Sequence, residues 1–178
     1  AGIFDAMNKG VALAGGAHIV ILNADDYFAP RAVERAVSAI VTEHSGVVFT
    51  DFVFVVDDIG LECPVPATLR LTRGMTLCHP GMFVSKETYE KHGLYELGCA
   101  YSSDFDFALR LFLARVKFTR VAEPLVYFVS GGAAERNLCR ASIEAMAIIR
   151  KQAGLPSGLP YAAMFTKRAA LRGMNWCI

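Results

Sequence analysis

The sequence of 178 residues predicts an α/β fold, and two patterns in it support this. Segments whose apolar residues recur at helical spacing alternate with short runs of β-branched and aliphatic residues, which is typical of a sheet flanked by helices. The run at residues 18–22 is followed shortly by two adjacent acids, Asp25 and Asp26. We expect this run to be a central, buried strand with ligand-binding residues at its carboxyl end. The length suits one compact domain with its own core.

The remaining elements follow from periodicity, caps and breakers. Helices are expected at residues 3–14, 30–43, 85–93, 102–115, 137–153 and 161–172, and further strands at residues 47–56, 61–63, 82–84, 117–122 and 125–129. In the second helix the apolar spacing places Val33 and Val37 on the inward face, beside Ala36 and Ile40. Prolines at positions 64 and 66 lack the donor that a central strand needs, so residues 64–68 are expected to form an exposed connection.

Composition excludes several classes of protein. The 18 Lys and Arg nearly balance the 17 Asp and Glu, so no nucleic-acid surface is expected. None of the five cysteines forms a Cys-x-x-Cys pair that could start a zinc site. The longest apolar run, residues 47–56, is too short to span a membrane, and no signal peptide is visible. We therefore expect a cytoplasmic protein, one that could work at the inner face of the cell membrane by peripheral association.

Asp25 and Asp26 are the first candidate functional residues. Two adjacent carboxylates repel each other and are costly to bury unless a cation or a basic ligand lies between them. A hard divalent cation is the simplest such partner, because carboxylate oxygens are among its preferred ligands. The alternative is that the pair merely ends a strand or begins a turn.

Three stretches, in order along the chain, resemble glycosyltransferase family 2. They are Gly2-Ile3-Phe4-Asp5-Ala6-Met7-Asn8-Lys9-Gly10, Leu22-Asn23-Ala24-Asp25-Asp26 and Ser103-Asp104-Phe105-Asp106-Phe107-Ala108-Leu109-Arg110. The resemblance covers nearly all of the first 135 residues. It implies the GT-A fold of nucleotide-diphospho-sugar transferases, a Rossmann-like, three-layer arrangement of a mixed sheet flanked by helices. It also implies metal-dependent, inverting transfer of a sugar from a nucleotide-diphospho-sugar to a glycan or lipid-linked acceptor in cell-surface polysaccharide biosynthesis.

The resemblance further implies how the chain is divided. Family 2 enzymes begin with a strand and acidic residues that hold the nucleotide base, and this chain starts after them. Residues 1–135 are therefore expected to be an N-terminally truncated GT-A catalytic domain, with sheet edges and apolar surface left exposed. Residues 136–178 are expected to form a C-terminal helical extension packed on that domain. A non-catalytic remnant of such an enzyme, with weak or no donor binding, is the alternative function.

The family motifs also imply roles for individual acids. Asp26 is the expected direct ligand of Mg²⁺ or Mn²⁺, and Asp25 is expected to contact the nucleotide ribose or the metal. Asp104 falls at the position of the catalytic base, which takes the proton of the acceptor hydroxyl during attack on the anomeric carbon. An acid in the first turn of a helix also stabilises free N–H groups there, so Asp104 has an ordinary structural alternative. Asp106 is expected to be structural, paired with Arg110 one turn on, or to bind the acceptor.

Five further residues are candidates for substrate binding. Asn8 and Lys9 face the donor by family position, where a lysine ammonium could hold a diphosphate oxygen; a solvated helix face is the alternative. His79 and Gly81 fall in the family's acceptor-side loop, although a lone histidine is more often a loop or core residue. Asp51 would be expensive to bury in the middle of a strand without a partner, which suggests that it faces the cleft.

Overall fold

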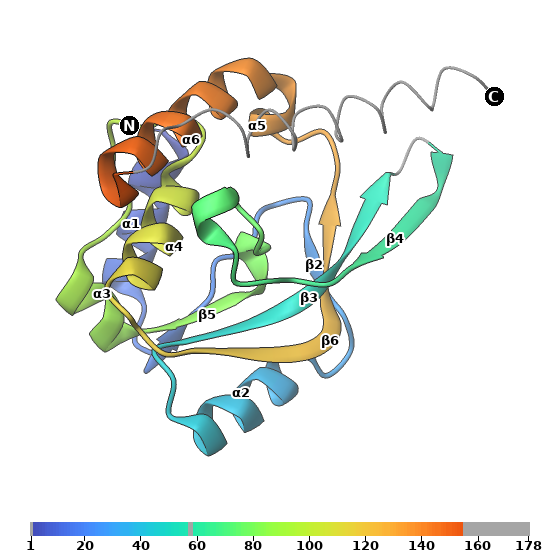
Figure 1. Ribbon diagram of the computed structural model, residues 1–178. Helices are drawn as coiled ribbons and strands as arrows, with labels where there is room; N and C mark the ends of the chain where they lie inside the picture. Colours follow the sequence, from blue (N-terminus) through green and yellow to red (C-terminus); the bar gives the residue numbers. More distant parts are fainter. Residues whose placement is uncertain (1, 57–58, 155–178) are drawn as a thin grey trace.

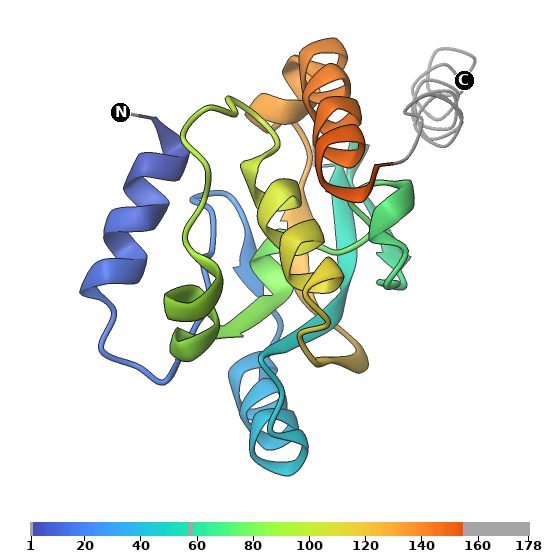
Figure 2. The same ribbon diagram turned by 60° about the vertical axis from the view of Figure 1, so that its left-hand side comes forward.

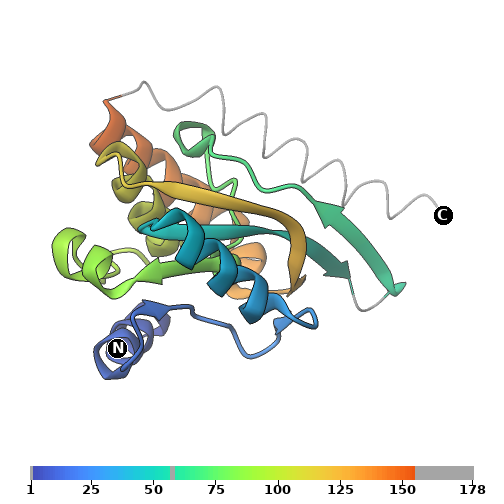
Figure 3. The same ribbon diagram turned by 90° about the horizontal axis from the view of Figure 1, so that it is seen from below.

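The computed structural model describes residues 2–56 and 59–154, which form a mixed sheet between two layers of helix (Figure 1). The helices are α1 (Ile3–Leu13), α2 (Ala32–Glu43), α3 (Lys86–His92), α4 (Ser103–Leu113), α5 (Ala133–Arg136) and α6 (Leu138–Ala153). The strands are β1 (His18–Ile19), β2 (Tyr27–Phe28), β3 (Val47–Val56), β4 (Leu61–Val65), β5 (Met82–Ser85) and β6 (Phe118–Val129). Figure 3 shows α2 across one face of the sheet, with α4 and α6 behind the opposite face. The expected three-layer α/β architecture is confirmed.

Two long parallel strands, β3 and β6, form the centre of the sheet. Its order is β1-β5-β3-β6-β2, with β4 folded back on β3 as a hairpin and the other pairings antiparallel. β6 is one continuous strand, whereas the sequence suggested two strands around Glu123-Pro124. Its register against β3 shifts near Asp51, which lies opposite Pro124, so the irregularity is absorbed within the strand. β4 extends through Pro64, because at a sheet edge the missing N–H donor interrupts no ladder.

The prediction of a central strand at residues 18–22 is wrong in both position and length. β1 contains only His18 and Ile19, and it pairs with β5 at the edge of the described sheet. Residues 20–24 continue past this pairing, and together with α1 they line a shallow groove. Figure 2 shows α1 standing beside this run of chain. An apolar run indicates contact with other apolar groups, and here a helix supplies much of that contact instead of a second neighbouring strand.

α2 packs on the sheet through small side chains. Ala36 is fully buried in a cluster with Val48 and Phe83, whereas Val33 and Val37 are 52% and 47% exposed. The expected inward orientation of the two valines is therefore wrong. Apolar residues cover more than one side of this helix, and alanine allows the closest approach of helix to sheet, so close packing selects the alanine side.

The larger part of the core lies between the sheet and the helices of the other face. α1 contributes Phe4 and Val11 to it, and α4 is buried along most of its length. α3 begins where the Ser85 hydroxyl accepts a hydrogen bond from the N–H of Thr88, and it ends at Gly93, whose φ is 82°. These are the capping residues that the sequence predicts for this helix.

The last helix among the described residues is α6, which packs against α4. This helix matches the one expected at residues 137–153. The helix expected at residues 161–172 lies outside the described residues. Within the described ranges, no helix combines the length and the apolar character needed to cross a membrane.

Candidate functional site

Two acids from distant parts of the chain lie within electrostatic reach of one buried histidine, and we call these three residues the central cluster. They are Asp26 from the connection between β1 and β2, His79 from the 3-10 turn before β5, and Asp104 from the first turn of α4. The charges of Asp104 and Asp26 both act on the His79 imidazole. The fold assembles the cluster because β1 and β5 are neighbours in the sheet and α4 packs in the same core.

Asp26 is buried, whereas the adjacent Asp25 is exposed. Only 6% of Asp26 is exposed, and its two carboxylate oxygens accept hydrogen bonds from the Val129 N–H at 2.9 Å and the Asn23 amide at 2.7 Å. Burial raises the pKa of Asp26, and these hydrogen bonds oppose the rise only in part. The carboxylate therefore ties the β1–β2 connection to the end of β6. Asp25 is the member of the pair whose carboxylate is open to a ligand.

Asp104 lies in the first turn of α4 and remains partly exposed. Its Oδ1 accepts a hydrogen bond from the N–H of Phe105 at 2.8 Å. Burial raises the pKa of this carboxyl, while the His79 charge and backbone N–H groups act in the opposite direction. A carboxylate with a raised pKa is a stronger base than an ordinary one, so the surroundings suit proton abstraction.

His79 is buried as well, with 8% of its surface exposed. Its Nε2 lies 2.8 Å from the Tyr95 hydroxyl, which in turn lies 2.9 Å from the Tyr89 hydroxyl. Burial lowers the pKa of His79, and the charges of Asp104 and Asp26 oppose this. The imidazole is thus held in one orientation through Nε2.

The structure gives Asn8 a partner within the protein. Its side-chain amide donates to the Tyr95 carbonyl at 2.9 Å, and its oxygen accepts from the Tyr95 N–H at 3.0 Å. Asn8 therefore fixes the backbone of the residue whose hydroxyl holds His79. Lys9 is 72% exposed and pairs with Asp5 at 2.8 Å, and this pair lowers the pKa of Asp5.

Gly81 is buried against β3. A Cβ added there would lie 2.8 Å from the Thr50 hydroxyl oxygen and 3.6 Å from Val126 Cγ2. Glycine at this position is thus required by close packing of the 3-10 turn on the sheet.

Asp51 and Asp106 have partners that account for their burial. Asp51 accepts two hydrogen bonds from the Arg120 guanidinium, at 2.8 and 2.7 Å, and one from the Ala67 N–H. The premise that Asp51 lacks a partner is therefore wrong, because β6 supplies an arginine from 69 residues away, whereas a role of Asp51 in substrate binding stays a prediction. Asp106 pairs with Arg110 at 3.1 Å, as the helical spacing predicts.

Tyr95 and Arg120 are the residues that the sequence did not single out. Tyr95 joins His79, Tyr89 and Asn8, and Arg120 neutralises Asp51. Each is separated from at least one of its partners by dozens of residues, so no local spacing signals the contact. The one available signal was Asp51 itself, since a buried carboxylate in a strand calls for a basic partner.

The acids of the site could bind a hard divalent cation only together with ligands from outside the protein. In residues 2–56 and 59–154, no three His, Cys, Asp or Glu side chains are grouped so that they could hold an ion by themselves. Asp25 presents an exposed carboxylate, and carboxylate oxygens suit Mg²⁺ and Mn²⁺. An ion at Asp25 would therefore need further oxygen ligands from water or from a bound molecule.

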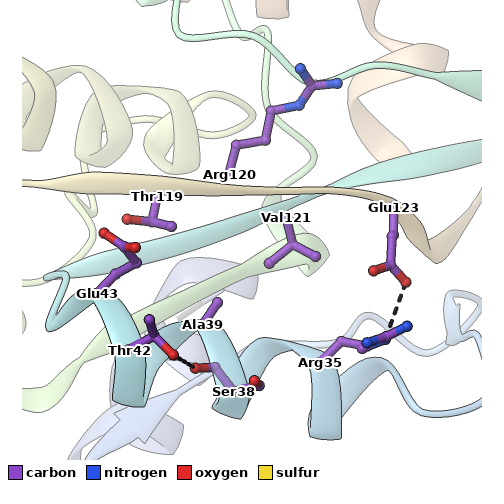
Figure 4. A pocket seen from close by; sticks show the side chains of 9 residues that line it. All are labelled: Arg35, Ser38, Ala39, Thr42, Glu43, Thr119, Arg120, Val121 and Glu123. Atoms are coloured by element: carbon purple, nitrogen blue, oxygen red, sulfur yellow. Dashed lines mark hydrogen bonds and ion pairs between the residues drawn. The ribbon is translucent and has the colours of Figure 1, made fainter.

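A second hollow lies on the opposite face of the sheet, between α2 and β6 (Figure 4). Arg35 and Glu123 form an ion pair of 3.3 Å across it, and Figure 4 shows the Arg120 side chain pointing away from it. None of the site residues predicted from the sequence lines this second hollow. It is separated by the sheet from α4, which carries Asp104.

The sequence matches a family model and several curated relatives. Residues 1–79 match the model of glycosyl transferase family 2. "PGL/p-HBAD biosynthesis glycosyltransferase" sequences from Mycobacterium bovis and Mycobacterium tuberculosis are 29% identical over 127 residues, which are 70% of this chain and 49% of each relative. The chain thus spans about half the length of the curated relatives it matches.

Solved structures share the fold. The crystal structure of S. aureus TarS 1-349 in complex with UDP matches with a TM-score of 0.64 and 16% identity, over 85% of this chain and 45% of that one. The same protein in complex with UDP-GlcNAc matches with a TM-score of 0.62 and 14% identity, over 85% of this chain and 48% of that one.

Proposed function

We propose that the chain is a family 2 glycosyltransferase that carries the metal and acceptor side of a sugar-transferring site, because residues 1–79 match the model of that family and the fold is shared with TarS. The donor would be a nucleotide-diphospho-sugar. The observation that carries the proposal is the position of Asp104, which lies partly exposed in the first turn of α4, within electrostatic reach of His79.

Asp104 is proposed as the general base of an inverting transfer. The acceptor hydroxyl gives its proton to the Asp104 carboxylate while its oxygen forms a bond to the anomeric carbon. The bond from that carbon to the diphosphate oxygen breaks on the opposite face, which inverts the configuration. Burial raises the pKa of Asp104, which makes its carboxylate a better acceptor for this proton. The neutral form of His79, favoured by its burial, avoids a full ion pair that would make Asp104 a weaker base.

Asp25 and Asp26 are proposed to form the metal end of the site, and each has a different role there. Asp25 offers the open carboxylate oxygens, and Asp26 fixes the loop that presents them. Mg²⁺ or Mn²⁺, when bound, would neutralise negative charge on the departing diphosphate. Lys9 is a candidate for a phosphate oxygen, because its side chain is exposed and its ion pair is with Asp5, which remains partly exposed. Asn8 is a weaker candidate, since the backbone of Tyr95 already occupies its amide.

The acceptor is proposed to be a glycan or lipid-linked molecule, and the working location the cytoplasm or the inner face of the cell membrane. The mycobacterial relatives are named for PGL/p-HBAD biosynthesis, which supports a biosynthetic glycosylation. The uridine nucleotide complexes of TarS support UDP as the first nucleotide to test.

Calorimetry with UDP and Mn²⁺, followed by a UDP-release assay with UDP-GlcNAc, tests the proposal. We expect UDP binding that depends on Mn²⁺ and is lost in Asp25→Asn. The Asp104→Asn variant should still bind UDP. Its cleavage of UDP-GlcNAc to form UDP should be at least about 100-fold slower, as expected for loss of a general base. Glu62→Gln removes an exposed carboxylate on β4 and is the matched control, expected to behave as wild type.

The outcomes separate the enzyme from a non-catalytic remnant. Binding without turnover in the wild-type chain would favour the remnant. Unchanged turnover in Asp104→Asn would refute the assignment of the base.

A further inference from the structure

α6 holds the start of the helix that carries Asp104. Figure 2 shows α6 alongside α4, and the two helices are in contact. The Glu144 carboxylate on α6 accepts hydrogen bonds from three successive N–H groups, those of Ala100 at 3.0 Å, Tyr101 at 2.9 Å and Ser102 at 3.1 Å. These amides immediately precede α4. Glu144 therefore holds the backbone that leads into the first turn of that helix.

Ser102 shows why α4 needs this support. Ser102 is the N-cap of α4, yet its side chain makes no capping bond to the helix. Its hydroxyl donates instead to the Ala141 carbonyl of α6 at 3.0 Å. A helix start without its own cap is free to fray unless other groups fix it. Here both the N–H and the hydroxyl of the N-cap residue are bound to α6.

A second attachment lies one turn further along α4. The Gln152 amide on α6 donates to both the carbonyl and the side chain of Asp106, and the other Asp106 oxygen accepts from Arg110. Asp104 therefore lies between two points at which α6 holds the backbone of α4. A displacement of either point would move the Asp104 carboxylate relative to His79.

We propose that Glu144 is a positioning residue for Asp104, acting through the three amides that precede α4. This inference rests on the proposed function, in which Asp104 is the base. It extends the site into α6, a helix outside the residues matched by the family model. Glu144 acts on the rate of proton transfer and leaves donor binding alone, because its contacts lie at the start of α4 and the proposed donor contacts lie at Asp25 and Lys9.

Glu144→Gln tests this role. A glutamine side chain has one acceptor oxygen in place of two, and its NH₂ group would face backbone N–H donors, so at least one of the three bonds is lost. We expect kcat for UDP release from UDP-GlcNAc to fall about tenfold to 100-fold while KM stays within about twofold, because a shift of the base slows chemistry without altering donor contacts. Hydrogen exchange should become faster in the peptide that spans residues 98–106.

Two further variants make the test specific. Gln152→Leu removes the second attachment and should also lower kcat, whereas Glu62→Gln on β4 should change neither kcat nor exchange at residues 98–106. A urea unfolding curve of each variant checks that the chain remains folded.

The possible failures are distinguishable. If the wild-type chain neither binds UDP nor turns over UDP-GlcNAc, the proposed function fails and this inference fails with it. If the wild type is active and Glu144→Gln exchanges faster at residues 98–106 yet keeps its kcat, only the positioning role is overturned. An equal loss in kcat and rise in KM would also overturn it, because donor binding would then depend on Glu144.

Discussion

Replacement of Gly81 with alanine should destabilise the fold, because the position leaves no room for a Cβ. An added Cβ would lie 2.8 Å from Thr50 Oγ1, inside the shortest separation that real Cβ atoms show, and 3.6 Å from Val126 Cγ2. Thr50 is fully buried, and its strand pairs with β5 and β6 on its two sides. Neither the hydroxyl nor the strand can move without disturbing other packing. Overpacking of this kind costs about 1–3 kcal/mol of unfolding free energy.

Urea denaturation followed by circular dichroism measures this cost. For a chain of this size, a loss of 1 kcal/mol corresponds to a fall in melting temperature of about 2–4 °C, so thermal unfolding gives a second measurement. Gly10→Ala is the matched control, because Gly10 lies within α1 and nothing is within 4 Å of its added Cβ. The Gly10→Ala variant should gain about 0.5–1 kcal/mol of unfolding free energy from helix propensity, whereas Gly81→Ala should lose unfolding free energy.

A double variant isolates the clash. Thr50→Ala removes the Oγ1 that meets the new Cβ, and this hydroxyl has no hydrogen-bond partner within the described residues, so no other group is left unpaired by its removal. The pair Gly81→Ala and Thr50→Ala should therefore be more stable than the sum of the single changes predicts, by at least about 1 kcal/mol. Strictly additive effects, or a Gly81→Ala chain as stable as wild type, would refute the packing argument. Lost UDP release in a fully stable Gly81→Ala chain would return Gly81 to the substrate-binding residues.

Five other predictions address the site and its supports. Asp51→Asn should lower the urea midpoint more than Glu62→Gln does, because it breaks the two bonds to Arg120; a cycle with Arg120→Ala should show positive coupling. Burial raises the pKa of Asp51, but the Arg120 hydrogen bonds, the Ala67 N–H and the Arg120 charge together lower it by more, so the pKa in the folded state lies below the ordinary value of 3.8. The stability that ionised Asp51 contributes is therefore complete above the ordinary pKa and is lost as the pH falls through the folded-state pKa. Measuring the free energy of unfolding as a function of acid pH would detect this loss. Since burial raises the pKa of Asp104, the pH–rate profile of UDP release should lose activity on its acid side at a pH above 3.8, and an acid limb below that value would contradict the environment described. Asn8→Leu should cost about 1–3 kcal/mol of unfolding free energy, because the Tyr95 N–H and carbonyl both lose a partner, while Asn8→Asp keeps the acceptor and should cost less. EDTA should abolish UDP binding in calorimetry and excess Mn²⁺ should restore it; binding unaffected by EDTA would remove the metal from the proposal.

Local features of the fold could be predicted from the sequence because their causes are local. The α3 helix is bounded by Ser85 and Gly93, whose capping and positive φ depend on neighbours within one turn. The Asp106–Arg110 pair depends only on helical spacing. Where two arrangements satisfied the same local rule, the sequence did not decide between them. Val33 and Ala36 both lie on apolar sides of α2, and only contact with the sheet selected the alanine.

The candidate site could be predicted in part because its residues lie in short motifs that resemble those of a known family. The motifs pointed to Asp26, His79 and Asp104, and the fold does bring both acids within electrostatic reach of His79. Their supporting contacts could not be predicted, because each depends on a partner far away in the sequence. Tyr95 reaches back 87 residues to Asn8, and Glu144 reaches back more than 40 residues to the start of α4.

The different exposure of Asp25 and Asp26 determines how variants of this acid pair should be interpreted. Asp26 has only 6% of its surface exposed and joins the β1–β2 connection to Val129, so a change there removes a buried hydrogen-bond acceptor and frees the loop. Lost activity in an Asp26 variant would therefore be ambiguous between a missing ligand and a displaced loop. Asp25 is exposed on that same loop, so Asp25→Asn can remove a ligand without removing a support. The Asp25 variant, with stability unchanged and Mn²⁺-dependent UDP binding lost, is the one that can assign a metal to this site.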